Sequence, residues 1–320
     1  MNGIKKLPVL ILAHNRFDKF LRCITTLYDQ GAKNIFVSID GPVNKNDIEI
    51  QNKIISFCNV NKLNINITTN HFLENNGCRL GPVKGISWFF NKNKYGVILE
   101  DDVIISKKCL EVYARLLKNK NIYNKYMSLS SFNELSNLKI EPLYSMPVWR
   151  SWGWASWADR WDQHMEFSSR IKNYSLLNLY KIMPKELRSA ETVKLLKACQ
   201  LNLLDAWDYE FNFTHIVNNY NSLTVGGINN FVYGFDKSAT HSFDVESLGI
   251  DFNLFSEREI EEDKIVLQNY RKVRLILNKC GFYYSPDINK IKFINQIIRI
   301  FYYSIIFRLR ILKRIIYNRL

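Results

Sequence analysis

The segment from Gly96 to Val103, GVILEDDV, constrains the fold more than any other part of the 320-residue chain. Its apolar residues 97–99 are typical of a parallel strand that is buried on both faces. Three acids, Glu100, Asp101 and Asp102, follow directly. Ligands of open α/β sheets bind where such strands end, so these carboxylates are expected at a binding edge.

Clustered carboxylates at that position favour a divalent metal, Mn²⁺ or Mg²⁺, with substrate phosphates completing its coordination. Asp102 also lies shortly before a helical pattern that begins near Ser106. Acids stabilise helix N-termini, so helix capping is the competing interpretation.

The residues before the acids alternate between strand and helix patterns. Strands are expected at 7–13, 34–39 and 63–68, and helices at 17–30, which Gly31 closes, and 48–57. This order predicts an α/β fold with a mostly parallel central sheet flanked by helices. Arg16 follows the first strand and could meet a phosphate, whereas Asp40 follows the second and could contact a ribose or base. Loop capping explains both residues equally simply.

The segment from Glu74 to Phe90, ENNGCRLGPVKGISWFF, contains three glycines at a spacing of four. It matches neither the GxGxxG nor the GxxxxGK[ST] fingerprint, which removes the main support for a dehydrogenase or a P-loop kinase. We expect the glycines to shape a loop, with Pro82 in the first turn of a helix that ends near Phe90.

Five tryptophans fall within residues 147–161, PVWRSWGWASWADRW. Trp154, Trp157 and Trp161 have the spacing of one helix face, which favours a core stripe. Trp152 and Gly153 are the candidates for a flat wall against a sugar or base.

A helical region is expected at 175–204, interrupted by Pro184, and LDAWDYEFNF follows it. This segment places Asp205, Asp208 and Glu210 among aromatic residues, where desolvation raises a carboxylate's pKa towards that of a general base. Acids on a water-facing helix are the alternative. On one helix, Asp205 would share the face of Asp208. Farther along, a strand is expected at 222–225, then a glycine-rich and aromatic loop ending in His241, then a charged helix at 257–279.

The formal charge of +14 is concentrated at the C-terminus, where residues 281–320 hold eight Lys or Arg against one acid, a net +7. The tail 291–320 interleaves basic and apolar residues, and its longest uncharged stretch is the eight residues 300–307. This pattern predicts a helix lying in an anionic membrane interface, rather than a spanning helix or a nucleic-acid-binding arm. Six scattered cysteines without a CxxC pair favour a cytoplasmic protein, here one attached to the inner face of the cell membrane.

Taken in order, Asp40, the EDD acids, WGW and AWDYEF resemble the GT-A glycosyltransferases related to N-acetylglucosaminyltransferase I, especially bacterial relatives in surface polysaccharide assembly. The resemblance covers roughly residues 7–242, and the sequence departs from it at Tyr209, where the relative has an acid. It implies donor contacts from the following residues: Arg16, Asp40, Arg79, Glu100, Asp101, Trp152, Gly153 and His241. It further implies that Asp102 coordinates the metal and that Asp208 is the catalytic base.

The resulting expectation is an inverting, metal-dependent transferase that moves a sugar from a UDP-sugar to a glycan or lipid-linked glycan. Residues 1–105 would bind the nucleotide sugar, 106–255 would bind acceptor and catalyse, 256–290 would form a helical extension, and 291–320 would associate with membrane. A metal-dependent phosphodiesterase or nucleotidyltransferase is one alternative, and a non-catalytic peripheral membrane protein is another.

Overall fold

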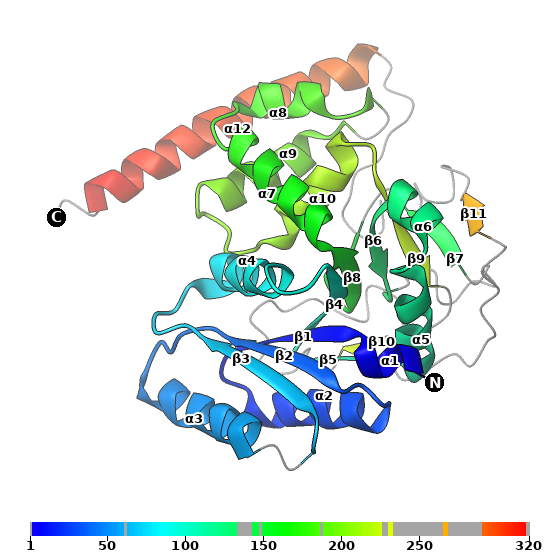
Figure 1. Cartoon of the computed structure of the whole chain (residues 1–320). Helices are drawn as coiled ribbons and strands as arrows, with labels where there is room; N and C mark the ends of the chain where they lie inside the picture. Colours follow the sequence, from blue (N-terminus) through cyan, green and yellow to red (C-terminus); the bar gives the residue numbers. More distant parts are fainter. Residues whose placement is uncertain are drawn as a thin grey trace.

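The computed structural model describes residues 2–60, 63–132, 143–146, 149–185, 188–225, 230–232, 265–267 and 290–317 (Figure 1). Its helices are α1 (Asn2–Lys6), α2 (Phe17–Asp29), α3 (Lys45–Val60), α4 (Gly77–Phe90), α5 (Lys107–Leu116), α6 (Lys120–Lys125), α7 (Ala158–Ile171), α8 (Leu176–Ile182), α9 (Ala190–Gln200), α10 (Asp208–Val217) and α12 (Lys290–Tyr317). Its strands are β1 (Pro8–Ala13), β2 (Asn34–Ile39), β3 (Asn66–His71), β4 (Tyr95–Glu100), β5 (Val103–Ile105), β6 (Tyr126–Ser130), β7 (Leu143–Met146), β8 (Trp154–Trp157), β9 (Asn221–Val225), β10 (Asn230–Val232) and β11 (Ile265–Leu267).

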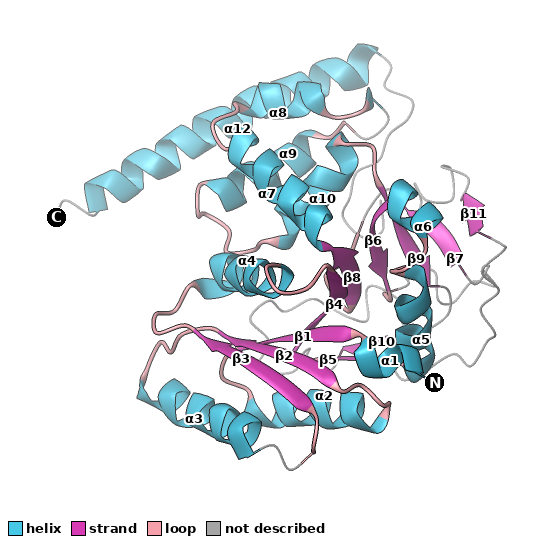
Figure 2. Ribbon diagram, in the orientation of Figure 1, coloured by secondary structure: helices cyan, strands magenta, loops and turns pink. Residues whose placement is uncertain are grey.

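The central sheet has the strand order β11-β7-β9-β6-β8-β4-β1-β2-β3 (Figure 2). Strands β3, β2, β1 and β4 are parallel neighbours, and β8 pairs antiparallel with both β4 and β6. β5 and β10 form a separate antiparallel pair. Because β1 lies between β2 and β4, the strand order reverses direction there, and such switch points are the usual ligand crevices of α/β sheets. The predicted α/β class with helices around a central sheet is confirmed.

Strand β1 is buried on both faces, as its continuous apolar run predicts. Val9 and Ile11 enter the core beneath α2 and α5, whereas Leu10 enters the core on the other face. In β4, Leu99 enters the same core as Val9 and Ile11, and Ile98 enters the same core as Leu10. The sheet therefore separates two apolar cores and holds the ends of β1 and β4 rigidly side by side.

Helix α4 covers the sheet face opposite α2 and α3, between the strands and the helical layer of α7–α10 (Figure 1). Its three glycines form a close-packing face rather than a loop. A Cβ on Gly81 would lie 2.8 Å from an Asp40 oxygen, and one on Gly85 would lie 2.7 Å from Ser38 Oγ. The prediction that Pro82 lies in the first turn was wrong, because α4 begins at Gly77.

The tryptophan segment differs from its helical prediction. Trp154 and Trp157 lie on strand β8, three residues apart, and so enter different cores, while Trp161 lies on α7. Trp154 and Trp161 join Trp149, which forms edge contacts with Trp154 at 4.9 Å and with Phe211 at 4.7 Å between ring centroids. The expectation of a tryptophan core is correct, although a strand and a helix build it.

The C-terminal helix α12 packs on α8 and α9 through Ile300 and Phe307. No helix within the described residues is both long and apolar enough to cross a membrane. Of the predicted charged helix at 257–279, residues 265–267 form strand β11 instead, and the remainder lies outside the described residues.

Candidate functional site

Arg16 and two of the predicted acids meet at the switch point. Parallel pairing aligns Leu12 with Glu100, so the residues after β1 and β4 emerge at the same sheet edge. Arg16 contacts Asp101 through Nε, at 3.3 Å, and through Nη2, and its Nη1 lies 2.8 Å from Asp102 Oδ2. Burial opposes the Arg16 charge, but Asp101 and Asp102 outweigh it and raise the pKa of the guanidinium.

Asp102 has the features of a metal ligand. Its side chain is buried, at 9% exposure, and Oδ1 has no hydrogen-bond partner among the described residues. A buried carboxylate oxygen without a partner is costly, and a cation would compensate it. Within the described ranges no three His, Cys, Asp or Glu side chains are grouped to hold a metal by themselves. One or two carboxylates completed by phosphate oxygens suit Mg²⁺ or Mn²⁺, so the residues fit such an ion.

Asp102 does not cap helix α5, so the alternative interpretation of this acid as a helix cap is wrong. Strand β5 separates Asp102 from α5, and Ser106 caps that helix by accepting a hydrogen bond from the Cys109 amide at 3.1 Å. The acids therefore lie at the sheet edge for another reason.

Asp208 interacts electrostatically with Glu100, the first of the three acids. It is the first residue of α10. Burial raises the pKa of Glu100 well above its usual range, and the charges of Asp102 and Asp208 raise it further against the opposing effect of Arg16. Burial similarly raises the pKa of Asp101. Segments more than 100 residues apart in sequence thus bring carboxylates to one region.

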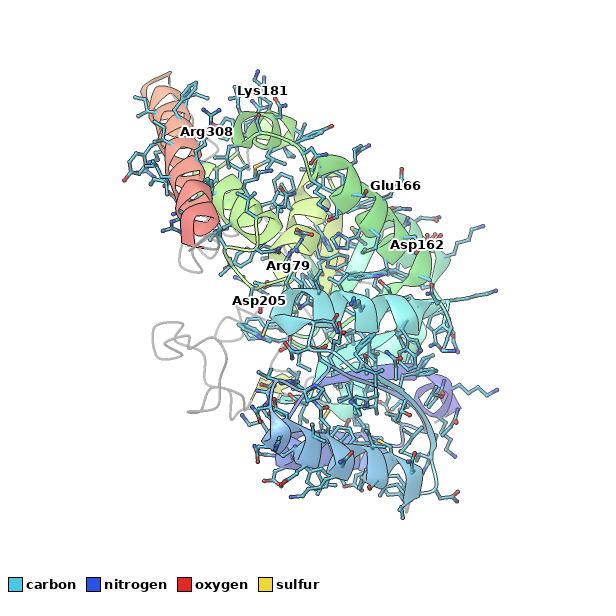
Figure 3. All side chains as sticks on the ribbon, turned by 90° about the vertical axis from the view of Figure 1, so that its left-hand side faces the viewer. Arg79, Asp162, Glu166, Lys181, Asp205 and Arg308 are labelled. Atoms are coloured by element: carbon cyan, nitrogen blue, oxygen red, sulfur yellow. The ribbon has the colours of Figure 1, made fainter. Side chains whose placement is uncertain are left out.

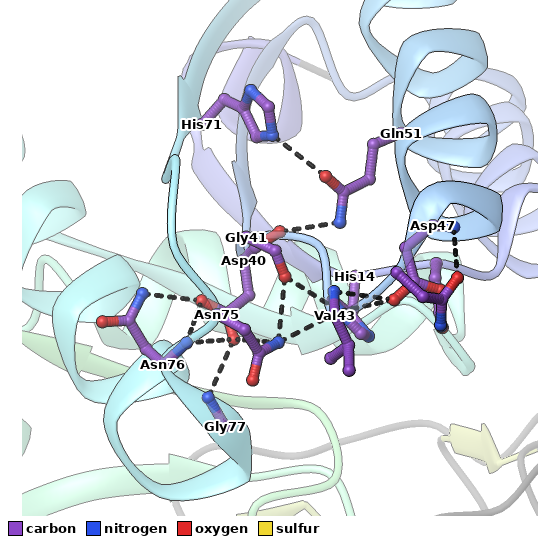
Figure 4. Close-up of polar contacts among 12 residues, drawn as sticks. His14, Asp40, Gly41, Val43, Asp47, Gln51, His71, Asn75, Asn76 and Gly77 are labelled. Carbon is purple, nitrogen blue, oxygen red and sulfur yellow. Dashed lines mark hydrogen bonds and ion pairs between the residues drawn. The ribbon is translucent and has the colours of Figure 1, made fainter.

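Asp40 holds the start of α4 (Figure 4). Its carboxylate accepts hydrogen bonds from the backbone amides of Asn76 and Gly77, each at 3.1 Å, and from Asn76 Nδ2 at 2.8 Å. Asn75 Nδ2 also approaches it, at 3.4 Å. This contact set is that of a loop cap, and the expected nucleotide contact stays a prediction.

Asp205 and Glu210 bind α4 to the helical layer. Figure 3 shows Asp205 and Arg79 close to each other. Asp205 precedes α10 and accepts from the Cys78 and Arg79 amides at 3.0 and 2.7 Å, so it does not share a helix face with Asp208. Glu210 is buried and pairs with Arg79 Nη2 at 2.9 Å. Asn202 accepts from Arg79 Nη1 at 3.0 Å. The role of Arg79 as a donor contact stays a prediction.

Trp152 and Gly153, the predicted sugar-contacting residues, directly precede strand β8. Gly153 has φ +72°, and a Cβ there would lie 2.6 Å from both Ile105 and Ser131. Its carbonyl accepts from Tyr113 Oη at 3.0 Å. Trp152 is partly buried and packs edge-on to Phe132 at 4.6 Å. Their proposed contact with a sugar is untested, and His241 lies outside the described residues.

Sequence reasoning missed the partners of these residues. It assigned Arg16 to phosphates without foreseeing its pairing with Asp101 and Asp102, and it overlooked Asn76. The adjacency of the first strand and the GVILEDD strand was the available signal for Arg16. Nothing in the local sequence indicates that Asp40 would bind the amides at the start of a helix that begins 37 residues later.

No family model matches the sequence, and no curated protein matches it. Among solved structures, UDP-glucose pyrophosphorylase complexed with UDP-glucose has a TM-score of 0.35 and 9% identity, covering 70% of this chain and 92% of that one. A putative glucose-1-phosphate thymidylyltransferase from Bacillus anthracis has a TM-score of 0.33 and 11% identity, covering 51% and 77%. HddC from Yersinia pseudotuberculosis, complexed with GMP-PN, has a TM-score of 0.32 and 12% identity, covering 48% and 77%. These likenesses are too loose to support an argument, so the site rests on its own residues.

Proposed function

We propose that the protein is an inverting, metal-dependent glycosyltransferase that uses a nucleoside-diphosphate sugar, with a UDP-sugar as the first candidate. The observation that carries the proposal is the unpartnered, buried Oδ1 of Asp102 at the switch point, next to Asp101. The charge of Asp208 also acts on the neighbouring Glu100. Asp102 would hold the metal, which when bound neutralises the charge of a leaving diphosphate. Residues 1–105 would bind the donor and 106–255 the acceptor.

The other residues have distinct roles in this proposal. Arg16 positions Asp101 and Asp102 through its ion pairs. Asp208 accepts the proton of the acceptor hydroxyl as that oxygen bonds to the anomeric carbon. The bond from that carbon to the diphosphate oxygen breaks at the same time, and its electron pair leaves with the nucleoside diphosphate. Asp205 and Glu210 have structural roles in this proposal, since Asp205 binds the first turn of α4 and Glu210 pairs with Arg79.

Asp208→Asn tests the assignment of the base. The amide keeps the shape and loses basicity, and general-base catalysis contributes roughly 10²- to 10⁴-fold, so kcat should fall by that order. UDP affinity in the presence of Mn²⁺ should stay within about twofold, as expected for an interaction made in the transition state. The exposed Asp162 on α7 provides the control Asp162→Asn. Near-normal turnover by Asp208→Asn would remove Asp208 as the base.

The reaction itself is tested with a panel of nucleotide sugars, with and without glycan acceptors. A glycosyltransferase releases nucleoside diphosphate in step with glycosylated product. Formation of a nucleoside triphosphate from nucleotide sugar and pyrophosphate would instead identify a nucleotidyltransferase, and hydrolysis of the diphosphate bond would identify a phosphodiesterase.

A further inference from the structure

Helix α12 carries an apolar stripe on its outer face. The exposed residues recur at the spacing of one helix face and are each 58–60% exposed: Ile298, Phe301, Tyr302, Ile305 and Leu309. Most other large exposed apolar residues of the described chain lie singly, and scattered residues of that kind need no explanation. The stripe is therefore the feature that requires a partner.

The opposite face of α12 determines which way the stripe points. Ile300 and Phe307 are buried in the core shared with α8 and α9. Tyr303 donates a hydrogen bond to Glu191 of α9, and Arg299 lies 3.6 Å from the same carboxylate. These contacts hold the helix at one rotation. The stripe consequently faces away from the protein, along the edge of the molecule that α12 forms (Figure 1).

The charge of α12 indicates the chemistry of the partner. Between Lys290 and Tyr317 the helix has no acidic residue. Its basic residues are Lys290, Lys292, Arg299, Arg308, Arg310, Lys313 and Arg314. Arg308 and Arg310 are exposed on either side of Leu309. A second copy of α12 would bring like charges together, and nucleic acid would not use the aliphatic side chains. An anionic bilayer satisfies both the charges and the apolar stripe.

We propose that α12 docks the folded protein on an anionic lipid surface, with the stripe buried at the level of the headgroups and with Arg308 and Arg310 at the lipid phosphates. The helix lies in the interface while its inner face stays on α8 and α9. The contacts that orient α12 involve α8 and α9 and none of the residues at the switch point. The lipid-binding proposal is therefore independent of the proposed glycosyl transfer.

Vesicle flotation of the full chain tests the proposal. The protein should float with vesicles of phosphatidylcholine containing about 30% phosphatidylglycerol, and should float poorly with pure phosphatidylcholine. Ile305→Glu and Phe301→Glu should each reduce the partition coefficient about tenfold or more, because each replaces an apolar side chain that enters the interface with a negative charge beside anionic lipid. Val60→Glu, at a 64% exposed position on α3, is the matched control and should float as the wild type does.

The basic residues are tested separately. Arg308→Gln with Arg310→Gln should weaken partition to the anionic vesicles about 25-fold, since each basic residue near the surface contributes about fivefold. Circular dichroism establishes that each variant is folded. Three results would overturn the proposal: a wild-type chain that remains with the lipid-free protein, stripe variants that float unchanged, or light scattering that finds a dimer which Ile305→Glu converts to monomer.

Discussion

Replacing Arg16 by Met should destabilise the protein, because it removes the guanidinium that pairs with two buried carboxylates. The side chains of Asp101 and Asp102 are 2% and 9% exposed, whereas that of Arg16 is 23% exposed. Removing one partner of a buried ion pair typically costs about 3–5 kcal/mol. Because water reaches part of the guanidinium, we expect the lower end, about 3 kcal/mol. With an m-value of about 3 kcal/mol/M in urea, the unfolding midpoint should fall by about 1 M.

Two further variants separate this electrostatic effect from a loss of packing. Adding Asp101→Asn to Arg16→Met should restore about 1 kcal/mol or more, because the amide carries no charge to desolvate. Lys194→Met breaks the more exposed pair with Glu191, whose atoms lie 3.2 Å apart, and should cost less than about 1 kcal/mol. An Arg16→Met midpoint within about 0.3 M of the wild type, or a double variant no more stable than the single one, would refute the reasoning.

Two other predictions concern the scaffold. Gly153→Ala should lower the free energy of unfolding by about 3 kcal/mol, because backbone strain at φ +72° adds to overlap of the new Cβ with neighbouring atoms. Gly31→Ala, at φ +95° with nothing within 4 Å of the new Cβ, should cost only the strain, about 1 kcal/mol. Equal losses of stability in urea unfolding would contradict the packing argument. Burial lowers the pKa of His164 to about 3 and of His215 to about 4. In the unfolded chain both imidazoles take up a proton below about pH 6.5, whereas in the folded protein they stay neutral. The free energy of unfolding should therefore be highest above that pH and should fall by about 2 kcal/mol for each histidine at pH 5. Nuclear magnetic resonance titration and urea unfolding at pH 7 and 5 measure this, and a titration of either ring near pH 6.5 would show that it is not buried in neutral form.

Burial keeps His215 neutral by lowering the pKa of its ring, and the hydrogen bond to the Phe211 carbonyl opposes that shift. Its Nδ1 donates to the Phe211 carbonyl at 2.8 Å, which leaves Nε2 to accept from Ser128 Oγ at 2.8 Å. The ring is fully buried, so a second proton on Nε2 would place a positive charge away from bulk water.

The strands before the acids were predictable from sequence because both faces of the sheet are covered. A doubly buried strand needs an unbroken apolar run, and the observed β1, β2 and β4 coincide closely with those runs. β3 lies at the sheet edge with half-exposed side chains, and its prediction was displaced by about three residues. Weaker apolar patterning explains that error.

The tertiary roles of polar residues were not predictable. Asp205 was expected on the same helix face as Asp208, but it caps α4, and only the fold brings those segments together. Trp154 and Trp157 have helical spacing, yet antiparallel pairing with β4 and β6 makes their segment a strand. The local sequence pattern indicates which residues are buried. Long-range contacts determine whether those residues lie on a helix or on a strand.

Calorimetric titration of UDP into the protein with and without Mn²⁺ tests the central claim, that Asp102 holds a metal for a nucleoside diphosphate. Wild-type protein should bind UDP only with the metal. Asp102→Ala should abolish that binding, and Asp162→Ala, at an exposed position on α7, should leave it unchanged (Figure 3). Metal-dependent UDP binding by Asp102→Ala that equals the wild type would contradict the account.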